Sequence, residues 1–371
     1  MIFHSISKRP VLIAGSGVRA ADAAGALLEF AKKTDIPVVT TMNSVDLIQD
    51  DLRLGFIGTY GNRVANMIVE QSDFVISIGA RLGLRQIGHV RERFAPNAKL
   101  IRCDVDQYEL SRNVKDDEEK YLVDAKDFIE KLIAEDIPKY TGWKKKCFEA
   151  KKELSVFDNE IGNNVMAKIS SMLPKDPIVA IDVGQNECWA AQSLSLKGEK
   201  GRIMISGGYA SMGCGLPFAV GASIAIGKKT VYCLTGDGGL QMNIQELQTI
   251  VHEKLPVKII VINNHTLGKI SEIQIKSYDR RFCITTEDSG YSVPDFEKIA
   301  VAYGIKAKTL KSYTELDDCE KWLFDNESCL INITLPMDCL LIPKVDWNTG
   351  VIKPDIDEKI QRKIESILCS C

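Results

Sequence analysis

An aspartate and an asparagine each follow an apolar segment in the second half of the chain, and their spacing suits a metal ion. Gly236-Asp237-Gly238 ends one apolar segment, and 24 residues separate it from Asn263-Asn264, which ends the next. Parallel strands joined by a helix bring their carboxyl ends together, at the edge where α/β sheets bind ligands. Asp237 and Asn264 would then offer two hard oxygen ligands of the kind that Mg²⁺ prefers.

The residues after this aspartate are suited to a phosphate group. Gly238 and Gly239 have no side chains, so a phosphate can approach the backbone closely. We expect a helix to begin near Gln241, and its first N–H groups would favour an anion at the same place. These residues predict a diphosphate held through magnesium, and two unrelated turns are the alternative.

Short apolar segments alternate with amphipathic ones in both halves, which is typical of parallel βαβ units. In the first half we expect strands over 11–14, 37–42, 74–78 and 99–105 and helices over 20–33 and 64–71. In the second half we expect strands over 178–182, 229–235, 257–263 and 329–334 and helices over 243–253 and 296–303. The predicted fold class is therefore α/β, with two doubly wound, mainly parallel-sheet domains.

A charge-rich segment lies between the two halves. It contains Lys144-Lys145-Lys146 and Lys151-Lys152, which favour a solvated linker helix. We therefore predict one domain over residues 1–136, a linker over 137–162, a second domain over 163–345 and a C-terminal tail over 346–371.

The composition argues against several classes of protein. Lysine and arginine total 47 against 50 aspartates and glutamates, a net charge of −3, so we expect no nucleic-acid partner. The uncharged segment 203–227 contains six glycines and Pro217, so we expect a buried loop and helix and no membrane association. The 11 cysteines are scattered and no signal-peptide pattern precedes Pro10, which favours reduced thiols and a cytoplasmic location.

Three strings of this sequence resemble the thiamine diphosphate enzyme family, in particular the acetolactate synthase large subunit. Residues 236–264 resemble the cofactor motif, residues 182–192 the segment that contacts the diphosphate, and residues 206–217 the loop that holds the pyrimidine. The resemblance extends from Arg9 to about Tyr303. It implies a central Rossmann-like domain followed by a domain that binds thiamine diphosphate.

The resemblance also assigns roles to individual residues. It implies that Asp237, Asn264 and the backbone carbonyl of Thr266 hold Mg²⁺. Met212 falls on the large apolar residue that wedges between the two rings of the cofactor and forces its bent conformer. Asn186 stands where the family usually has histidine. The other positions assigned to thiamine diphosphate are Gly184, Gln185, Ala210, Gly238, Gly239 and Gly268.

The first half carries a weaker ligand pattern. Gly15-Ser16-Gly17 follows a strand and opens a helix, a loose dinucleotide fingerprint, but the next strand lacks the acid that would bind a ribose, which disfavours NAD. The resemblance points instead to FAD, although Tyr60 and Gly83 depart from the residues usual there. A ligand-free domain and another adenine nucleotide are the alternatives. The FAD positions are Gly15, Gly17, Gly58, Gly79, Arg81, Arg85 and Asp104.

The family normally has a pyrimidine-binding domain before the central domain, and its glutamate protonates N1′ of the cofactor. In this sequence Met1 stands nine residues before Pro10, where the central domain opens, so no residue of the chain is assigned that role. We expect a homo- or hetero-oligomer in which a chain with a pyrimidine-binding domain supplies the glutamate. The alternative is an inactive cofactor-binding fragment or a regulatory module.

The resemblance implies a carboligase of the acetolactate synthase type, acting in branched-chain amino acid biosynthesis. Such an enzyme decarboxylates pyruvate and transfers the two-carbon unit to a 2-oxo acid. Lys269 and Ile273 stand where the family commonly has methionine and tryptophan, so a keto-sugar acceptor or simple 2-oxo acid decarboxylation are alternatives. Lys269 would either place a cation near a bound carboxylate or phosphate or point to the surface.

Overall fold

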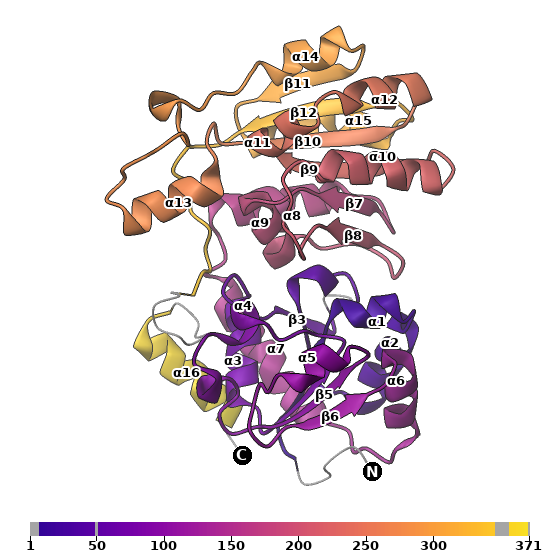
Figure 1. Cartoon of the computed structure of the whole chain (residues 1–371), viewed down its shortest axis with the longest axis vertical. Helices are drawn as coiled ribbons and strands as arrows, with labels where there is room; N and C mark the ends of the chain where they lie inside the picture. Colours follow the sequence, from indigo (N-terminus) through magenta and orange to yellow (C-terminus); the bar gives the residue numbers. More distant parts are fainter. Residues whose placement is uncertain (1–6, 49–50, 346–355, 370–371) are drawn as a thin grey trace. The chain divides into compact units, whose positions relative to one another are not determined.

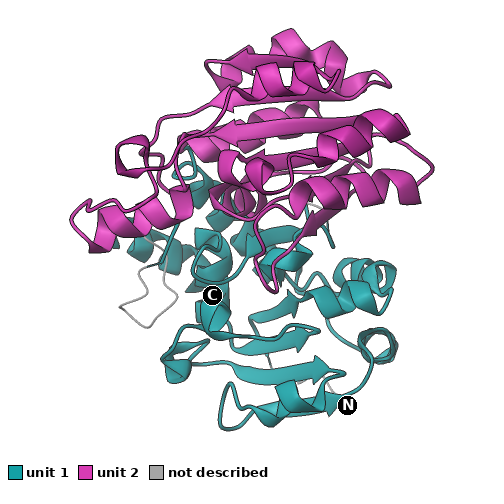
Figure 2. Cartoon of the chain, turned by 45° about the horizontal axis from the view of Figure 1, so that its top comes forward, with its two compact units in different colours: residues 1–159, 342–371 teal, residues 160–341 magenta. Residues whose placement is uncertain are grey.

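The computed structural model describes residues 7–48, 51–345 and 356–369, and the chain divides into two compact units (Figure 2). The first unit comprises Met1–Asn159 with Ile342–Cys371, and the second comprises Glu160–Leu341. Each unit contains one six-stranded sheet in which every strand pair is parallel (Figure 1). The predicted α/β class with two parallel-sheet domains is therefore confirmed.

The sheet of the first unit has the strand order β3-β2-β1-β4-β5-β6. Its central strands β1 and β4 are buried along their whole length, as continuous apolar runs in a parallel sheet should be. The strands are β1 (Pro10–Ala14), β2 (Val38–Thr40), β3 (Arg53–Phe56), β4 (Phe74–Ile78), β5 (Lys99–Asp104) and β6 (Glu119–Leu122).

The helices of the first unit form two groups around the sheet. One group contains α2 and α6, and the other contains α3, α7 and α16. The predicted helix over 20–33 is broken after Ala20, because Asp22 adopts the left-handed conformation with φ 51°. The helices are α1 (Ser16–Ala20), α2 (Ala24–Thr34), η1 (Met42–Ser44), α3 (Arg63–Gln71), α4 (Leu84–Ile87), η2 (Arg91–Arg93), α5 (Gln107–Ser111), α6 (Ala125–Ala134), α7 (Thr141–Ser155) and α16 (Glu358–Cys369).

The segment predicted as a solvated linker is instead part of the first unit, whose boundary lies after Asn159. Helix α7 buries Trp143, Cys147, Ala150 and Leu154 in the core of this unit. These residues are spaced by four, three and four positions, so they form one apolar stripe that the lysines between them obscure. The linker prediction over 137–162 therefore relied on charge content where periodicity was the better signal.

The end of the chain also differs from the predicted tail. Residues 346–355 of the predicted tail lie outside the described residues. Helix α16 belongs to the first unit and buries Ile364 and Leu368 in its core. The second unit accordingly ends at Leu341, four residues before the predicted boundary at Val345.

The sheet of the second unit has the strand order β11-β12-β10-β9-β7-β8. Strand β10 is buried at every residue, and its register pairs Ile262 with Gly236 of β9. This register brings the residues that follow the two strands to the same edge of the sheet. The strands are β7 (Ile178–Ile181), β8 (Arg202–Ile205), β9 (Val231–Gly236), β10 (Val257–Asn263), β11 (Lys306–Leu310) and β12 (Cys329–Thr334).

The helices of the second unit differ from the prediction mainly after β9. The predicted helix over 243–253 is preceded by a separate short helix that begins at Asp237 rather than near Gln241. The uncharged segment 203–227 forms the end of β8, a loop and α10, and within the described residues no helix is both long and apolar enough to cross a bilayer. The helices are α8 (Ile161–Met172), α9 (Gln185–Ser193), α10 (Gly215–Ala225), α11 (Asp237–Met242), α12 (Glu246–Glu253), α13 (Gly268–Ser277), η3 (Glu287–Ser289), α14 (Phe296–Ala302), η4 (Tyr313–Cys319) and α15 (Glu320–Phe324).

Candidate active site

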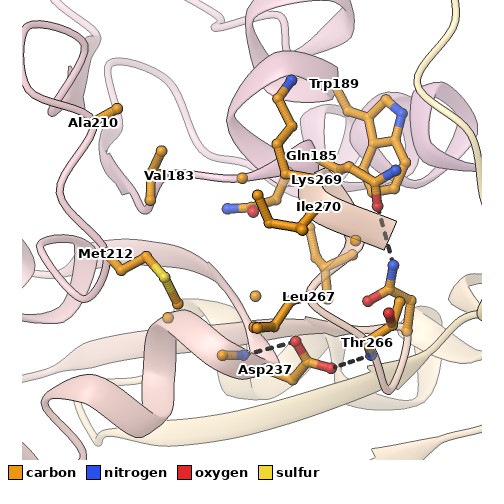
Figure 3. A pocket seen from close by; sticks show the side chains of 18 residues that line it. Val183, Gln185, Trp189, Ala210, Met212, Asp237, Thr266, Leu267, Lys269 and Ile270 are labelled. Carbon is orange, nitrogen blue, oxygen red and sulfur yellow. Dashed lines mark hydrogen bonds between the residues drawn. The ribbon is translucent and has the colours of Figure 1, made fainter. Parts of the chain in front are cut away.

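A cavity of about 240 Å³ lies in the second unit, lined by residues that follow β7, β9 and β10 (Figure 3). All ten positions that the resemblance assigns to thiamine diphosphate line this cavity, together with the third predicted metal ligand. These residues are Gly184, Gln185, Asn186, Ala210, Met212, Asp237, Gly238, Gly239, Asn264, Thr266 and Gly268. Segments far apart in the sequence therefore meet at one edge of the sheet.

Asp237 places a buried carboxylate at the floor of this cavity. Its two oxygens accept hydrogen bonds from the backbone N–H groups of Gly238 (2.7 Å) and Thr266 (3.2 Å) (Figure 3). Burial raises the pKa of Asp237 to about 6, although these N–H groups and the nearby Tyr291 hydroxyl partly lower it. Within the described part of the chain this carboxylate has no ion-pair partner, so its charge is available to a bound cation.

Asn264 presents an amide oxygen to the same cavity because its nitrogen is already bonded. Asn264 Nδ2 donates to Gln185 Oε1 at 3.0 Å, and Gln185 Nε2 donates to the carbonyl of Cys339 at 2.8 Å. The Thr266 carbonyl accepts from Gly268 N–H (2.8 Å) and keeps a second lone pair.

The donor set formed by Asp237, Asn264 and the Thr266 carbonyl consists of oxygen atoms alone, which fits Mg²⁺. No cluster of three or more His, Cys, Asp or Glu side chains that could hold a metal occurs among the described residues. A site for a softer metal such as zinc, which prefers nitrogen and sulfur ligands, is therefore not what these residues offer.

The glycines around Asp237 are required by close packing. A Cβ at Gly238 would lie 2.7 Å from Leu267 Cδ2 and 3.3 Å from Met212 Cε. A Cβ at Gly268 would lie 2.1 Å from Gln185 Oε1. A side chain at either position would fill the cavity or displace its walls.

Met212 and Asn186 lie differently from each other in the cavity. Met212 is 43% exposed and points inward from the loop before α10 (Figure 3). Asn186 is buried, and its Nδ2 donates a hydrogen bond to the carbonyl of Asp182 at 2.8 Å, so this amide nitrogen already has an acceptor within the second unit.

Lys269 lines the cavity from the first turn of α13. Its ammonium group donates to the Cys188 thiol of α9 at 3.2 Å, and Figure 3 shows the side chain extending away from Asp237. Burial raises the pKa of Cys188, and the neighbouring Lys269 partly lowers it. The ammonium is thus held against α9 in the wall of the cavity. This position is intermediate between the two sequence alternatives, a cation near a bound carboxylate or phosphate and a side chain that points to the surface.

Several residues that line the cavity received no individual role from the sequence, although some of them lie inside the strings that carry the resemblance. Trp189 is the largest of them and is 1% exposed. It follows Gln185 by one helical turn on α9, so an i, i+4 pattern counted from Gln185 would have found it. The others lack that helical spacing and are Val183, Gly236, Ile262, Leu267 and Ile270.

In the first unit, three of the glycines predicted for FAD lie together. A Cβ at Gly15 would lie 2.0 Å from the carbonyl oxygen of Gly79, and one at Gly17 would lie 2.7 Å from its Cα. The N–H groups of Gly15 and Gly17 donate to the carbonyls of Ile78 (2.9 Å) and Gly79 (3.0 Å). These N–H groups serve the packing of two loops, so they are not directed at a phosphate.

The other predicted FAD positions have partners within the first unit, but the side chains of Arg81 and Arg85 are exposed. Arg81 pairs with Glu109 at 2.7 Å, and Asp104 accepts a backbone hydrogen bond of 3.0 Å from two residues on. Gly58, at φ 116°, packs against the carbonyl of Arg85, whose side chain is exposed.

Comparisons with known proteins agree with this arrangement. The model of the thiamine pyrophosphate (thiamine diphosphate) enzyme central domain matches residues 5–132, and that of the C-terminal TPP binding domain matches residues 182–333. The chain is 35% identical, over 96% of its length, to a probable acetolactate synthase large subunit of Methanocaldococcus jannaschii. It is 32% identical over 92% of its length to the acetolactate synthase large subunit of Lactococcus lactis, and 33% identical over 81% to the isozyme 2 large subunit of Escherichia coli.

The chain spans 63%, 60% and 54%, respectively, of the length of these three relatives. One matched region lies within each of the two parallel-sheet units, and the cofactor-binding match contains every residue that lines the cavity. The chain therefore carries the central and C-terminal domains of the thiamine pyrophosphate enzymes and belongs to that family.

Proposed function

We propose that this chain provides the central and cofactor-binding domains of a Mg²⁺-dependent carboligase of the acetolactate synthase type. The carrying observation is the convergence of Asp237, Asn264, Thr266 and Met212 on one cavity of a chain similar to acetolactate synthase large subunits. Its substrate would be pyruvate, with a 2-oxo acid as acceptor, in a cytoplasmic pathway of branched-chain amino acid biosynthesis.

The metal would be held by the carboxylate of Asp237, the amide oxygen of Asn264 and the carbonyl of Thr266. Gly238 and Gly239 allow a phosphate to approach the start of α11 closely. The negative charge of the Asp237 carboxylate is compensated once Mg²⁺ occupies the site, which removes the cost of burying it.

The apolar walls would position the organic part of the cofactor and exclude water. Met212 and Leu267 both lie next to Gly238: a Cβ at Gly238 would lie 3.3 Å from Met212 and 2.7 Å from Leu267, so these two side chains form the walls of the cavity there. When bound, thiamine diphosphate supplies the electron sink for cleaving a 2-oxo acid. Water exclusion by Met212, Leu267 and Ile270 would protect that chemistry from side reactions.

The catalytic glutamate is assigned to no residue of this chain, and we propose that a pyrimidine-binding domain of a partner in a homo- or hetero-oligomer supplies it. Apolar side chains exposed on the second unit support such a partner. Tyr209 is 97% exposed, Met242 57% and Ile270 48%. Exposed apolar side chains near a cavity commonly mark an interaction surface.

Binding of thiamine diphosphate to the full chain, with Mg²⁺ or with a chelator, is the first test. We expect binding only with Mg²⁺, and none in the Asp237→Asn variant. The second test adds pyruvate and a protein carrying a pyrimidine-binding domain and measures CO₂ and acetolactate. Metal-independent binding, or no CO₂ with every such protein, contradicts the proposal.

Two further candidates have their own observations. Lys269 and Ile273 differ from the residues common in the family, which favours another acceptor such as a keto-sugar, or plain decarboxylation. Product analysis with several acceptors distinguishes these reactions.

A non-catalytic cofactor-binding or regulatory module is the alternative of another class. Tight Mg²⁺-dependent binding without turnover in any pairing would support that module.

For the first unit, we propose a ligand-free domain in preference to one that binds FAD or another adenine nucleotide. The N–H groups of Gly15 and Gly17 and the guanidinium of Arg81 already have partners within the unit. The test is flavin fluorescence in the supernatant after the purified protein is denatured. Stoichiometric flavin would contradict this proposal.

A further inference from the structure

The loop that carries Met212 is fastened to its domain by hydrogen bonds just after Met212. Residues 207–212 are exposed. The N–H of Gly213 donates to one carboxylate oxygen of Asp182 at 3.0 Å, and the N–H of Gly215 donates to the other at 3.0 Å. On the opposite side, Asn243 Nδ2 donates to the carbonyl of Gly213 at 2.9 Å. The peptide groups next to Met212 are therefore held from both sides.

Asp182 is an unusual residue to find in this place. It follows β7 and is 0% exposed, and its carboxylate also accepts hydrogen bonds from the N–H of Val183 at 2.8 Å and from the side chain of Thr235. Burial raises the pKa of Asp182, and the N–H groups of Gly215, Gly213 and Val183 partly lower it. A buried carboxylate bonded to neutral donors costs more free energy than an apolar residue of similar size, so stability alone does not account for it.

The same carboxylate also contacts the helix that begins at the metal ligand. A Cβ at Gly239 would lie 2.9 Å from Asp182 Cγ and 2.9 Å from Thr235 Oγ1. Gly239 is the third residue of α11, which starts at Asp237. One buried side chain thus contacts both the loop of Met212 and the helix of Asp237.

We propose that Asp182 is a positioning residue that sets the separation between Met212 and the diphosphate end of the cofactor site. This inference rests on the proposed function, because Met212 contacts a ring of the cofactor only if thiamine diphosphate binds here. Gly213 has φ 84°, a conformation that costs glycine little, and the bonds at Gly213 and Gly215 fix the backbone that follows Met212. Without them, Met212 would swing with the exposed loop.

The variant that tests this role is Asp182→Asn. The amide keeps the shape of the carboxylate but replaces one acceptor with an NH₂ group that faces an N–H donor. We expect the affinity for thiamine diphosphate with Mg²⁺ to fall about tenfold, since a hydrogen bond to a charged group contributes that much. Inorganic pyrophosphate with Mg²⁺ occupies the diphosphate end alone, so its affinity should change less than about twofold.

Amide hydrogen exchange gives a readout that needs no cofactor. In Asp182→Asn we expect exchange at Gly213 and Gly215 to accelerate at least about tenfold, because their acceptors are weakened. The matched control is Asp176→Asn, which removes a carboxylate that accepts the N–H of Lys200 at 2.7 Å at the other end of β7. This control should match wild type in cofactor affinity and in exchange at both glycines.

A second variant keeps the proposal testable if Asp182→Asn does not fold. Asn243→Ala removes the other bond to Gly213 and should give the same divergence between thiamine diphosphate and pyrophosphate. Equal losses of affinity for the two ligands in either variant, or wild-type exchange at Gly213 and Gly215 in Asp182→Asn, overturn the proposal. If the wild-type chain fails to bind thiamine diphosphate, the proposed function fails, and the exchange experiment still decides whether Asp182 holds the loop.

Discussion

The side chains of Gln185 and Asn264 share a hydrogen bond of 3.0 Å although 79 positions separate them in the sequence. Gln185 opens α9 after β7, and Asn264 follows β10, with β9 between the two strands in the sheet. The bond uses the amide nitrogen of Asn264 as donor, so the amide oxygen is the atom left for a metal. The orientation of a predicted metal ligand therefore depends on a residue from another strand.

Replacing Gln185 by leucine should disturb the metal site without contacting the metal. The Gln185→Leu variant leaves Asn264 Nδ2 buried without its acceptor, at a cost of about 1–3 kcal/mol, and frees the amide to rotate. We expect Mg²⁺-dependent affinity for thiamine diphosphate to fall about tenfold, measured by calorimetry. The control Gln248→Leu lies on an exposed face of α12 and should bind as wild type does. Unchanged affinity in Gln185→Leu would show that cofactor binding does not depend on the hydrogen bond by which Gln185 orients the Asn264 amide.

A methyl group at Gly268 should break the same bond by steric contact. Its Cβ would lie 2.1 Å from Gln185 Oε1 and 2.7 Å from Asn264 Nδ2, so Gly268→Ala must displace one of them. We expect a loss of about 1–3 kcal/mol in the free energy of unfolding and loss of Mg²⁺-dependent binding.

The control for Gly268→Ala is Gly221→Ala, in α10, where a Cβ would have no heavy atom within 4 Å. It should stabilise the protein by about 0.5–1 kcal/mol, because alanine favours a helix interior. Urea unfolding of both variants checks the prediction, and equal effects at the two positions would contradict it.

The strands that sequence reasoning missed share one place in the fold. They are β3, β6, β8 and β11, the four edge strands of the two sheets. Central strands are buried on both faces and show as continuous apolar runs, whereas an edge strand such as β6, with the sequence EKYL, is exposed along most of its length. A strand lies at an edge because it pairs with only one neighbour, and the sequence of a single segment does not reveal which strands pair.

The site was predictable where its residues follow strands in recognisable motifs. Asp237 and Asn264 were found because each directly follows an apolar strand. The roles of Asp182 and Tyr291 were not found, since their contacts with the loop of Met212 and with Asp237 depend on how separate segments pack. The sequence pattern therefore identifies a residue that faces a ligand, such as Asp237, more readily than a residue that supports the site from behind, such as Asp182.

The free energy of unfolding of the metal-free protein should depend on pH through Asp237. Burial raises the pKa of Asp237 from 3.8 to about 6, so the folded state keeps a proton that the unfolded chain releases. This stability is complete below pH 3.8 and is lost as pH rises to about 6, an effect of about 3 kcal/mol. Asp237→Asn should remove this slope and be the more stable protein at neutral pH.

Denaturant unfolding at a series of pH values, with and without Mg²⁺ and thiamine diphosphate, measures this effect. The ligands should flatten the slope in the wild type and leave Asp237→Asn unchanged. Asp288→Asn, which changes an exposed carboxylate of the same unit, is the control and should retain the wild-type slope. A wild-type slope in Asp237→Asn would assign it to another group.

A second pH effect, of opposite sign, should come from Asp325. Burial raises the pKa of Asp325, but hydrogen bonds from Lys258 (2.8 Å) and Lys306 outweigh this and lower it to about 2. The stabilisation is present above the ordinary value of 3.8 and is lost as pH falls towards 2. The Asp325 side chain is 36% exposed, so solvent screening reduces the contribution to about 1 kcal/mol.

Asp325→Asn should therefore make the second unit less stable at neutral pH and less sensitive to acid between about pH 4 and pH 2. The loss at neutral pH should reach about 2 kcal/mol, because the Lys258 side chain is 0% exposed and would lose its carboxylate partner. Asp318→Asn removes the partner of Lys308 in an exposed pair, whose side chains are 61% and 41% accessible, and should change stability little. If acid unfolding of Asp325→Asn follows the wild-type curve, the buried lysine is held by the carbonyl of Glu327 and the carboxylate contributes nothing.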